Sequence, residues 1–122
     1  MQWLFEGSDE APDLPGFGLL AGRCFRLPDI VKVPHVGWNT LDGAQHSPRL
    51  LRDLPPGAMA YFTHSFAAPI GDAMAAVTTH GTSFAAAIER GRVFGTQFHP
   101  EKSGATGLRV LANFMAVVEE AR

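Results

Sequence analysis

The sequence predicts an α/β fold in which short, mostly antiparallel or mixed strands precede one buried C-terminal helix. Short segments that alternate between apolar and polar residues, separated by turn-forming residues, recur between residues 31 and 98. Residues 106–120 then form an apolar-rich stretch of helical length. With 122 residues, 46% of them hydrophobic, the chain is long enough for one domain and too short for two ordinary ones.

The first 25 residues contain a predicted helix end, a loop and an extended stretch. Residues 1–6 are predicted as the last turns of a helix because they are largely apolar and run into a loop rich in Asp, Glu, Pro and Gly. Residues 16–21 match the G-x-G-x-x-A pattern of dinucleotide sites, but a polar loop precedes them and no helix follows. A loop-to-strand turn is the favoured interpretation, and Cys24 after it is expected to be a buried structural cysteine.

The middle of the chain is predicted to form strands joined by tight turns, which indicates antiparallel pairing. Residues 42–57 are expected to form a loop with a helical turn. The proline at position 34 marks an edge or a bulge. The predicted strands are residues 31–39, 60–66, 75–80, 83–89 and 92–98, with a hairpin turn at residues 89–92.

The C-terminal helix is predicted over residues 106–120. Arg109, Asn113 and Glu120 lie on one narrow polar stripe, and most other positions are apolar. We therefore expect broad burial against a sheet, worth about 1.5–3 kcal/mol for each large side chain. Ser103 or Thr106 is expected to cap the start of the helix.

Composition excludes several classes of function. Ten Lys and Arg residues against twelve Asp and Glu residues give a net charge of −2 and a pI near 6.2, so no basic face for nucleic acid is expected. No apolar run reaches the roughly 20 residues that span a bilayer, and residues 1–6 lack the features of a signal peptide. We expect a cytoplasmic protein without membrane contact, and the single cysteine agrees with a reducing compartment.

The segment with the clearest chemical character is residues 95–104. A short bend after Pro100 would leave His99 and Glu101 side by side at the end of a strand. The carboxylate can then hold one ring nitrogen and leave the other to act as a base, although the same contact also occurs as a structural hydrogen bond. Such a base needs a nucleophile, and Cys24 lacks the strand-turn-helix elbow of small residues that would suit it.

Histidine is frequent enough in this chain to raise the question of a metal site. No spacing between these residues matches a known zinc pattern, so hydrogen-bonded histidines at strand ends are favoured and no metal is expected. The histidines are His35, His46, His64, His80 and His99.

Residues 95–103, Gly-Thr-Gln-Phe-His-Pro-Glu-Lys-Ser, resemble the His-Pro-Glu segment of class I (triad-type) glutamine amidotransferases. Further segments are similar to the glutaminase subunits of imidazole glycerol phosphate synthases, a branch of that family; they are residues 33–39, 61–66, 104–108 and 111–114. The resemblance covers nearly the whole chain in order. It implies a flavodoxin-like α/β domain of which this chain is the C-terminal part, and it implies no cofactor.

The resemblance also implies roles for particular residues. In this family a cysteine thiolate attacks the side-chain amide of L-glutamine, and the matching positions here make His99 the residue that handles protons and Glu101 the residue that orients it. The residues implied to bind substrate are Gln2, His64, Ser65 and Phe66, the last of which replaces a tyrosine usual in the family. The residues implied to face the ammonia-using partner, a (βα)-barrel cyclase, are Trp38, Tyr61 and Lys102.

The same resemblance accounts for the missing nucleophile. In the family it lies in a Gly-x-Cys-Leu-Gly-Met-Gln segment, and residues 1–6 resemble the continuation of that segment. The nucleophile is thus expected three residues before Met1. We expect residues 1–122 to be a single partial domain that lacks the nucleophile half and is inactive alone.

The favoured function is therefore a truncated glutaminase subunit that, when intact, supplies ammonia to a cyclase subunit in histidine biosynthesis as part of a heterodimer. One alternative is a non-catalytic docking module that binds a synthase, or a fragment without function. A further alternative is another class I amidotransferase subunit, such as those for pyridoxal phosphate or guanylate synthesis. The Pro-His-Val-Gly-Trp-Asn stretch at residues 34–39 argues against this last alternative.

Overall fold

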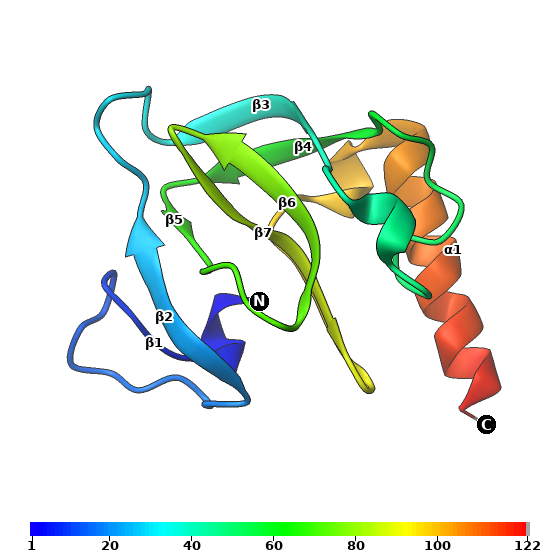
Figure 1. The fold of residues 1–122 in the computed structure, drawn as a ribbon, viewed down its shortest axis with the longest axis horizontal. Coiled ribbons are helices and arrows are strands. Elements are labelled where there is room, and N and C mark those ends of the chain that lie inside the picture. The colour runs from blue at the N-terminus through cyan, green and yellow to red at the C-terminus, as the bar shows by residue number, and fades with distance from the viewer. Residues whose placement is uncertain (122) are drawn as a thin grey trace.

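A computed structural model describes residues 1–121. It has the predicted mixed α/β architecture, with short strands followed by one long helix (Figure 1). In Figure 1, α1 lies on one side of the molecule, β1 and β2 lie on the other, and β6 and β7 lie between them. In the part of the chain that the structure describes, no helix is long and apolar enough to cross a membrane. The elements, in chain order, are 3₁₀ helix η1 (Gln2–Leu4), β1 (Phe5–Ser8), β2 (Leu20–Arg26), β3 (His35–Thr40), 3₁₀ helix η2 (Ala44–His46), β4 (Met59–His64), β5 (Phe66–Ala67), β6 (Met74–His80), β7 (Thr82–Arg90), β8 (Val93–Thr96), 3₁₀ helix η3 (Pro100–Lys102) and α1 (Gly104–Glu120).

The N-terminal sheet has the order β1-β2-β5, and the pairing of β1 with β2 is parallel. The helix end predicted for residues 1–6 is wrong. Only a short 3₁₀ turn forms there, and from Phe5 the backbone pairs with a strand that begins at Leu20. Short-range apolar spacing could not reveal this pairing, because the partner strand lies about fifteen residues further along the chain. The loop-to-strand turn expected near residue 20 leads into β2, as predicted.

The rest of the chain forms the antiparallel sheets that were predicted. Strand β3 pairs with β4, and β6, β7 and β8 form a three-stranded meander. Three predicted strands differ in extent from those observed. Residues 31–34 lie outside the strand, so β3 begins at His35, and the expected strand over residues 60–66 is interrupted at Ser65 between β4 and β5. The strand expected over residues 92–98 ends at Thr96, so His99 follows a bend at residues 97 and 98 instead of the strand itself.

The larger hydrophobic core lies where these sheets and α1 meet. Phe62 of β4 packs edge-on against Phe84 of β7 and against Phe98, with both ring-centroid separations at 5.9 Å. Val110 of α1 belongs to the same cluster of buried residues. Because Phe98 is buried in this core, the backbone immediately before residue 99 has a fixed position.

Helix α1 was predicted to be broadly buried, and the structure buries only one stripe of it, formed by Gly107, Val110 and Asn113. Asn113, expected on the polar stripe, is buried because its side-chain amide donates to the carbonyl oxygens of Leu50 and Arg52, at 3.0 and 2.8 Å. A second stripe on another side of the helix is apolar and exposed; it comprises Leu108, Leu111, Met115 and Val118. Spacing alone cannot tell which side of a largely apolar helix meets the core.

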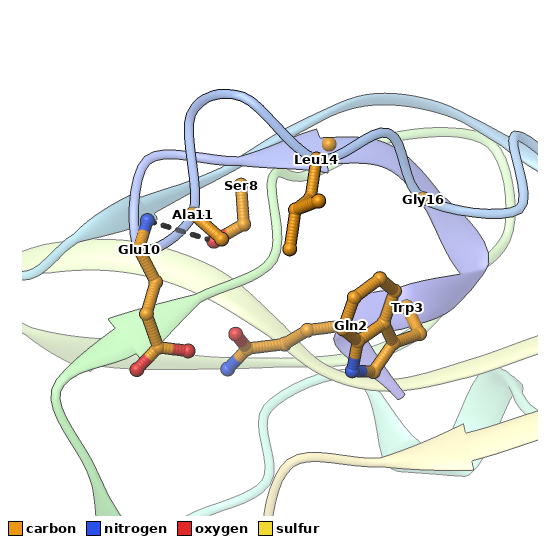
Figure 2. Close-up of a pocket in the computed structure, with 8 residues that line it drawn as sticks. Gln2, Trp3, Ser8, Glu10, Ala11, Leu14 and Gly16 are labelled. Atoms are coloured by element: carbon orange, nitrogen blue, oxygen red, sulfur yellow. Dashed lines mark hydrogen bonds between the residues drawn. The ribbon is translucent and has the colours of Figure 1, made fainter.

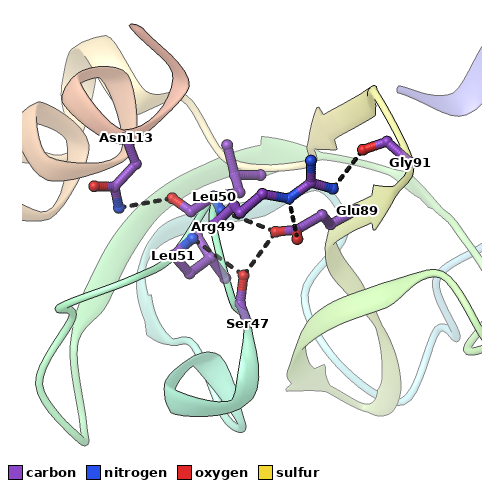
Figure 3. Close-up of polar contacts among 7 residues, drawn as sticks. All are labelled: Ser47, Arg49, Leu50, Leu51, Glu89, Gly91 and Asn113. Atoms are coloured by element: carbon purple, nitrogen blue, oxygen red, sulfur yellow. Dashed lines mark hydrogen bonds and ion pairs between the residues drawn. The ribbon is translucent and has the colours of Figure 1, made fainter. Parts of the chain in front are cut away.

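A buried carboxylate at the end of β7 ties the loop at residues 47–52 to the sheet (Figure 3). Glu89 accepts hydrogen bonds from the Ser47 hydroxyl at 2.9 Å and from the Leu50 backbone N–H at 2.8 Å. Arg49 donates to the other carboxylate oxygen at 3.2 Å and also donates to the carbonyl oxygen of Gly91. Burial acts to raise the pKa of Glu89, but the hydrogen bonds and the Arg49 charge outweigh burial and lower it.

The Glu89→Gln variant is expected to lower the free energy of unfolding by about 1.5–3 kcal/mol at pH 7, because an amide cannot replace a charged acceptor for all of these donors. Since the folded pKa of Glu89 lies below its ordinary value of 4.5, the stabilisation is complete above that value and is lost as the pH falls through the folded pKa. The difference between variant and wild type should therefore shrink in acid. Urea unfolding at a series of pH values measures it.

The control for this prediction is Asp13→Asn, which neutralises an exposed loop carboxylate. It should change the free energy of unfolding by less than about 0.5 kcal/mol at every pH. A Glu89→Gln variant that unfolds like the control would contradict the structural role given to this carboxylate.

Candidate functional site

The backbone around His99 is held on β4 by a set of hydrogen bonds. The His99 N–H donates to the Tyr61 carbonyl oxygen at 3.0 Å. The Ser103 hydroxyl donates to the His99 carbonyl oxygen at 2.6 Å and accepts from the Tyr61 N–H at 2.9 Å. Ser103 was expected to cap α1, and it precedes the helix, but its side chain makes these contacts instead of a cap. The histidine is thereby positioned by the sheet rather than by a free loop.

His99 and Glu101 lie side by side, with 3.3 Å between Nδ1 of the ring and Oε2 of the carboxylate. The ring is 40% exposed and the carboxylate 58% exposed. When the ring is neutral, its Nδ1–H donates to the carboxylate and Nε2 is left as an acceptor, which is the state required of a base. The 3₁₀ turn that begins at Pro100 produces this geometry, because it brings the side chains of residues 99 and 101 to the same side.

The first turn of α1 packs directly against this segment. Gly107 lies so close to the Pro100 backbone that a Cβ atom there would stand 1.8 Å from the Pro100 carbonyl oxygen. The glycine thus allows α1 to approach η3, and it sets the distance between the helix and the residues that carry His99 and Glu101.

Beside His99 an aromatic and basic surface is exposed. Trp38 and Tyr61 are cross-strand partners on β3 and β4, with ring centroids 6.2 Å apart, and the ammonium group of Lys102 lies 5.9 Å from the centre of the Tyr61 ring. Trp38 is 52% exposed. The structure therefore brings the three residues predicted to face a partner into one patch, which we call the Trp38 surface.

Of the residues predicted to bind substrate, Phe66 contacts Gln2 directly. The Gln2 amide nitrogen donates to the Phe66 carbonyl oxygen at 2.8 Å and to Oε1 of Gln97 at 3.0 Å. Gln97 stands two residues before His99 in the chain. His64, in contrast, is buried and has both ring nitrogens engaged within the protein, while Ser65 uses its carbonyl oxygen to accept from the Leu27 N–H.

A pocket opens beside Gln2, between η1, the end of β1 and the loop at residues 9–19 (Figure 2). The loop folds back on β1, where Gly16 donates its N–H to the Glu6 carbonyl oxygen and has no room for a side chain. Across the pocket the carboxylate of Glu10 and the amide of Gln2 point toward one another (Figure 2). The lining residues are Gln2, Trp3, Gly7, Ser8, Glu10, Ala11, Leu14 and Gly16.

The chemistry of this pocket suits a small ammonium group. Both N–H groups of the Gln2 amide are engaged by Phe66 and Gln97, so the oxygen Oε1 is the atom that Gln2 can offer to a ligand. Glu10 adds a carboxylate from the opposite side of the same pocket. Two oxygen acceptors that face each other across a pocket favour a positively charged donor between them. Glu10 was missed at the level of sequence because it stands in a polar loop, where an acidic residue is ordinary.

The single cysteine does not have the features of a nucleophile. Cys24 is fully buried in the second apolar cluster, and its thiol contacts the Gln2 carbonyl oxygen at 3.8 Å. Burial raises the pKa of the Cys24 thiol from 9.0 to about 11, so the reactive thiolate is scarce at neutral pH. Among residues 1–121, no three His, Cys, Asp or Glu side chains are grouped closely enough to hold a metal ion.

Comparison with known proteins shows similarity along almost the whole chain. Residues 20–118 match the model of the family described as "Glutamine amidotransferase class-I". Three relatives share the description "Imidazole glycerol phosphate synthase subunit HisH". The relative from Deinococcus radiodurans is 52% identical over 93% of this chain and 54% of its own length. The relative from Xylella fastidiosa is 49% identical over 94% of this chain and 58% of its own length. The relative from Bacillus cereus is 42% identical over 98% of this chain and 57% of its own length. The chain thus spans about half the length of the curated relatives it matches.

Proposed function

The chain belongs to the class-I glutamine amidotransferase family, and on this premise we propose that it forms part of the glutaminase subunit of an imidazole glycerol phosphate synthase. The proposal rests on the names of its relatives and on one observation above all, the contact between His99 and Glu101. Residues 1–122 would then be a single partial domain of that subunit. The cytoplasmic location expected from the sequence belongs to the same proposal.

In the proposed reaction a thiolate attacks the side-chain amide carbon of L-glutamine, the C–N bond breaks and ammonia leaves with a proton from His99. Water then hydrolyses the resulting thioester, which releases glutamate and restores the thiol. His99 serves as the group that accepts and returns protons, through Nε2. Glu101 holds the opposite ring nitrogen and keeps the ring in the required tautomer. The hydrogen bonds of Ser103 to residues 61 and 99 hold the pair against β4, so that little reorganisation precedes the proton transfer.

We further propose that the pocket beside Gln2 holds the amino-acid end of glutamine. Its α-ammonium group is a donor that matches Oε1 of Gln2 and the carboxylate of Glu10. Gln97 contacts Gln2 and lies next to the catalytic segment in the chain, which provides the connection from the pocket to His99. Phe66 contributes its backbone carbonyl, so the replacement of the usual tyrosine leaves this contact intact.

The thiol for this reaction is, in our proposal, not among residues 1–122. The chain has one cysteine, and its burial and raised pKa oppose a catalytic role. The partner is a (βα)-barrel cyclase that docks on the Trp38 surface, where an exposed tryptophan and a tyrosine are the kind of residues that anchor protein interfaces.

The test is to purify the chain at its full natural length, add a barrel cyclase subunit and measure glutamate released from L-glutamine. Release is expected, and it should be unchanged in a Cys24→Ala variant. A peptide limited to residues 1–122 should release none. Loss of activity with Cys24→Ala in soluble, folded protein would overturn the assignment of the thiol.

The same experiment separates the rival interpretations. A full-length chain that binds the barrel but releases no glutamate would point to a non-catalytic docking module. A full-length chain that releases glutamate only with the partner of another amidotransferase would place it in a different branch of the family. Either result would contradict the proposed function.

A further inference from the structure

A chain of hydrogen bonds crosses the core from β3 to the substrate pocket through two buried histidines. The amide nitrogen of Asn39 lies 3.3 Å from Nε2 of His35, and Nδ1 of His35 lies 2.9 Å from Nε2 of His64. Nδ1 of His64 lies 2.9 Å from the Phe66 carbonyl oxygen, which is the same oxygen that accepts from Gln2. Both rings are buried, with residue exposures of 4% and 9%.

The partners determine where each proton lies. A carbonyl oxygen only accepts, so Nδ1 of His64 must carry a proton, and in a neutral ring Nε2 of His64 is then an acceptor. His35 must therefore donate from Nδ1 and accept at Nε2. The Asn39 amide supplies that donor, and its own orientation is fixed because Nδ2 also donates to the Thr79 carbonyl oxygen while Oδ1 accepts from the Thr40 N–H.

We propose that His35 and His64 are positioning residues of the substrate site, which hold the Phe66 carbonyl oxygen and through it the side chain of Gln2 in the orientation that binds L-glutamine. This inference rests on the proposed function. The ring nitrogens of both histidines are engaged within the protein, so in this proposal neither residue contacts the substrate directly. Their effect passes through one backbone oxygen that receives two donors, so the direction of the Gln2 amide depends on the donor at His64.

The rings of His35 and His64 must both stay neutral for this series of hydrogen bonds to persist. Burial, followed by the nearby His80 and His64, lowers the pKa of His35 to about 4. Burial also lowers the pKa of His64, more than its hydrogen bond to Phe66 raises it, and His80 lowers it further. The ring of His80 stacks on His35 at 4.1 Å, while Phe62 and Phe84 supply apolar cover. Because the pKa values of both rings lie below 6.5, the series of hydrogen bonds is intact at neutral pH and is lost as the pH falls toward 4.

Two substitutions of His64 by amide side chains distinguish a role in positioning the Phe66 carbonyl oxygen from a role in packing alone. In His64→Asn the side-chain amide occupies the place of Nδ1 and can still donate to Phe66. In His64→Gln the amide reaches the place of Nε2 and this donor is lost. The control is His80→Phe, which keeps an aromatic ring against His35 and lies outside the hydrogen-bond chain to Phe66.

The experiment measures L-glutamine affinity by calorimetry and the glutaminase KM and kcat, with the full-length natural chain and a barrel cyclase subunit. His64→Gln should weaken affinity and raise KM by about fivefold to tenfold with little change in kcat, the size expected for one lost hydrogen bond. His64→Asn and His80→Phe should stay within about twofold of wild type. Nitrogen-15 NMR of the imidazoles should find His35 and His64 protonated at Nδ1 at pH 7.

Each result decides the inference. Equal effects of His64→Asn and His64→Gln on KM, or a His64 ring protonated at Nε2, would overturn it. If the protein binds glutamine but releases no glutamate, the proposed glutaminase activity is contradicted. The affinity and NMR measurements then decide this inference by themselves. Absence of glutamine binding by the unaltered chain would overturn the proposed function and the inference together.

Discussion

Replacing His99 with alanine is expected to reduce glutamate release from L-glutamine by about 100-fold to 10,000-fold, the range that a positioned acid-base group contributes. The side chain is 40% exposed, and its backbone contacts to Tyr61 and Ser103 remain in the variant. Stability should therefore change little. Glutamate release by the full-length chain with a barrel cyclase measures the effect, and unfolding in urea confirms that the fold is retained.

Two further variants sharpen this prediction. Glu101→Gln should lower activity less than His99→Ala does, because the carboxylate only orients the ring and is more exposed than the ring itself. His46→Ala removes an exposed histidine outside the site and should leave activity unchanged. Retention of more than about a tenth of the activity by His99→Ala would contradict the role of this residue as the acid-base group.

The Gly107→Ala variant is expected to lose stability and activity together. In an ordinary helix this change is favourable by about 1 kcal/mol. Here the new methyl group would lie 1.8 Å from the Pro100 carbonyl oxygen and 2.7 Å from the carbonyl carbon. Backbone atoms cannot rotate away from it, so α1 and η3 must separate. We expect a loss of about 1–3 kcal/mol in the free energy of unfolding, as in other overpacked sites.

The effect of Gly107→Ala on activity follows from the same displacement. The segment that moves carries His99 and Glu101, and a shift of about 1 Å in a catalytic group can cost 100-fold in rate. Gly71→Ala is the matched control, since a Cβ atom at Gly71 has no neighbouring atom within 4 Å. Urea unfolding and glutamate release measure both variants. A Gly107→Ala variant as stable and active as the control would show that the close approach of α1 is not required.

The antiparallel half of the fold was predictable because short strand-forming segments and the tight turns between them are local signals. The contact of His99 with Glu101 was also local, since two residues and one proline define it. Which side of α1 meets the core depends instead on packing against segments that are distant in the sequence. Asn113 illustrates this, because its partners Leu50 and Arg52 lie more than 60 residues away along the chain.

Parts of the fold and of the candidate site had no signal in a single sequence. His35 meets His64 only because β3 and β4 pair in a register that places these two residues opposite one another, and the long connection between the strands leaves that register open. The sequence predicted Glu89 at the start of a hairpin turn. The side chains that donate hydrogen bonds to its carboxylate come from a loop some forty residues earlier in the chain. Glu10 is brought to the pocket only because its loop folds back over Gln2, and nothing in the local sequence indicates that fold.

The parallel pairing of β1 and β2 bears on how recognition in this pocket can change during evolution. A chain that returns to start a parallel strand must travel back along the whole strand, so it needs a longer connection than a hairpin does. That connection, residues 9–19, supplies half of the pocket wall. Insertions or deletions within it can therefore alter the shape of the pocket beside Gln2, and with it the ligand that fits there, while the ladder between the two strands keeps its register.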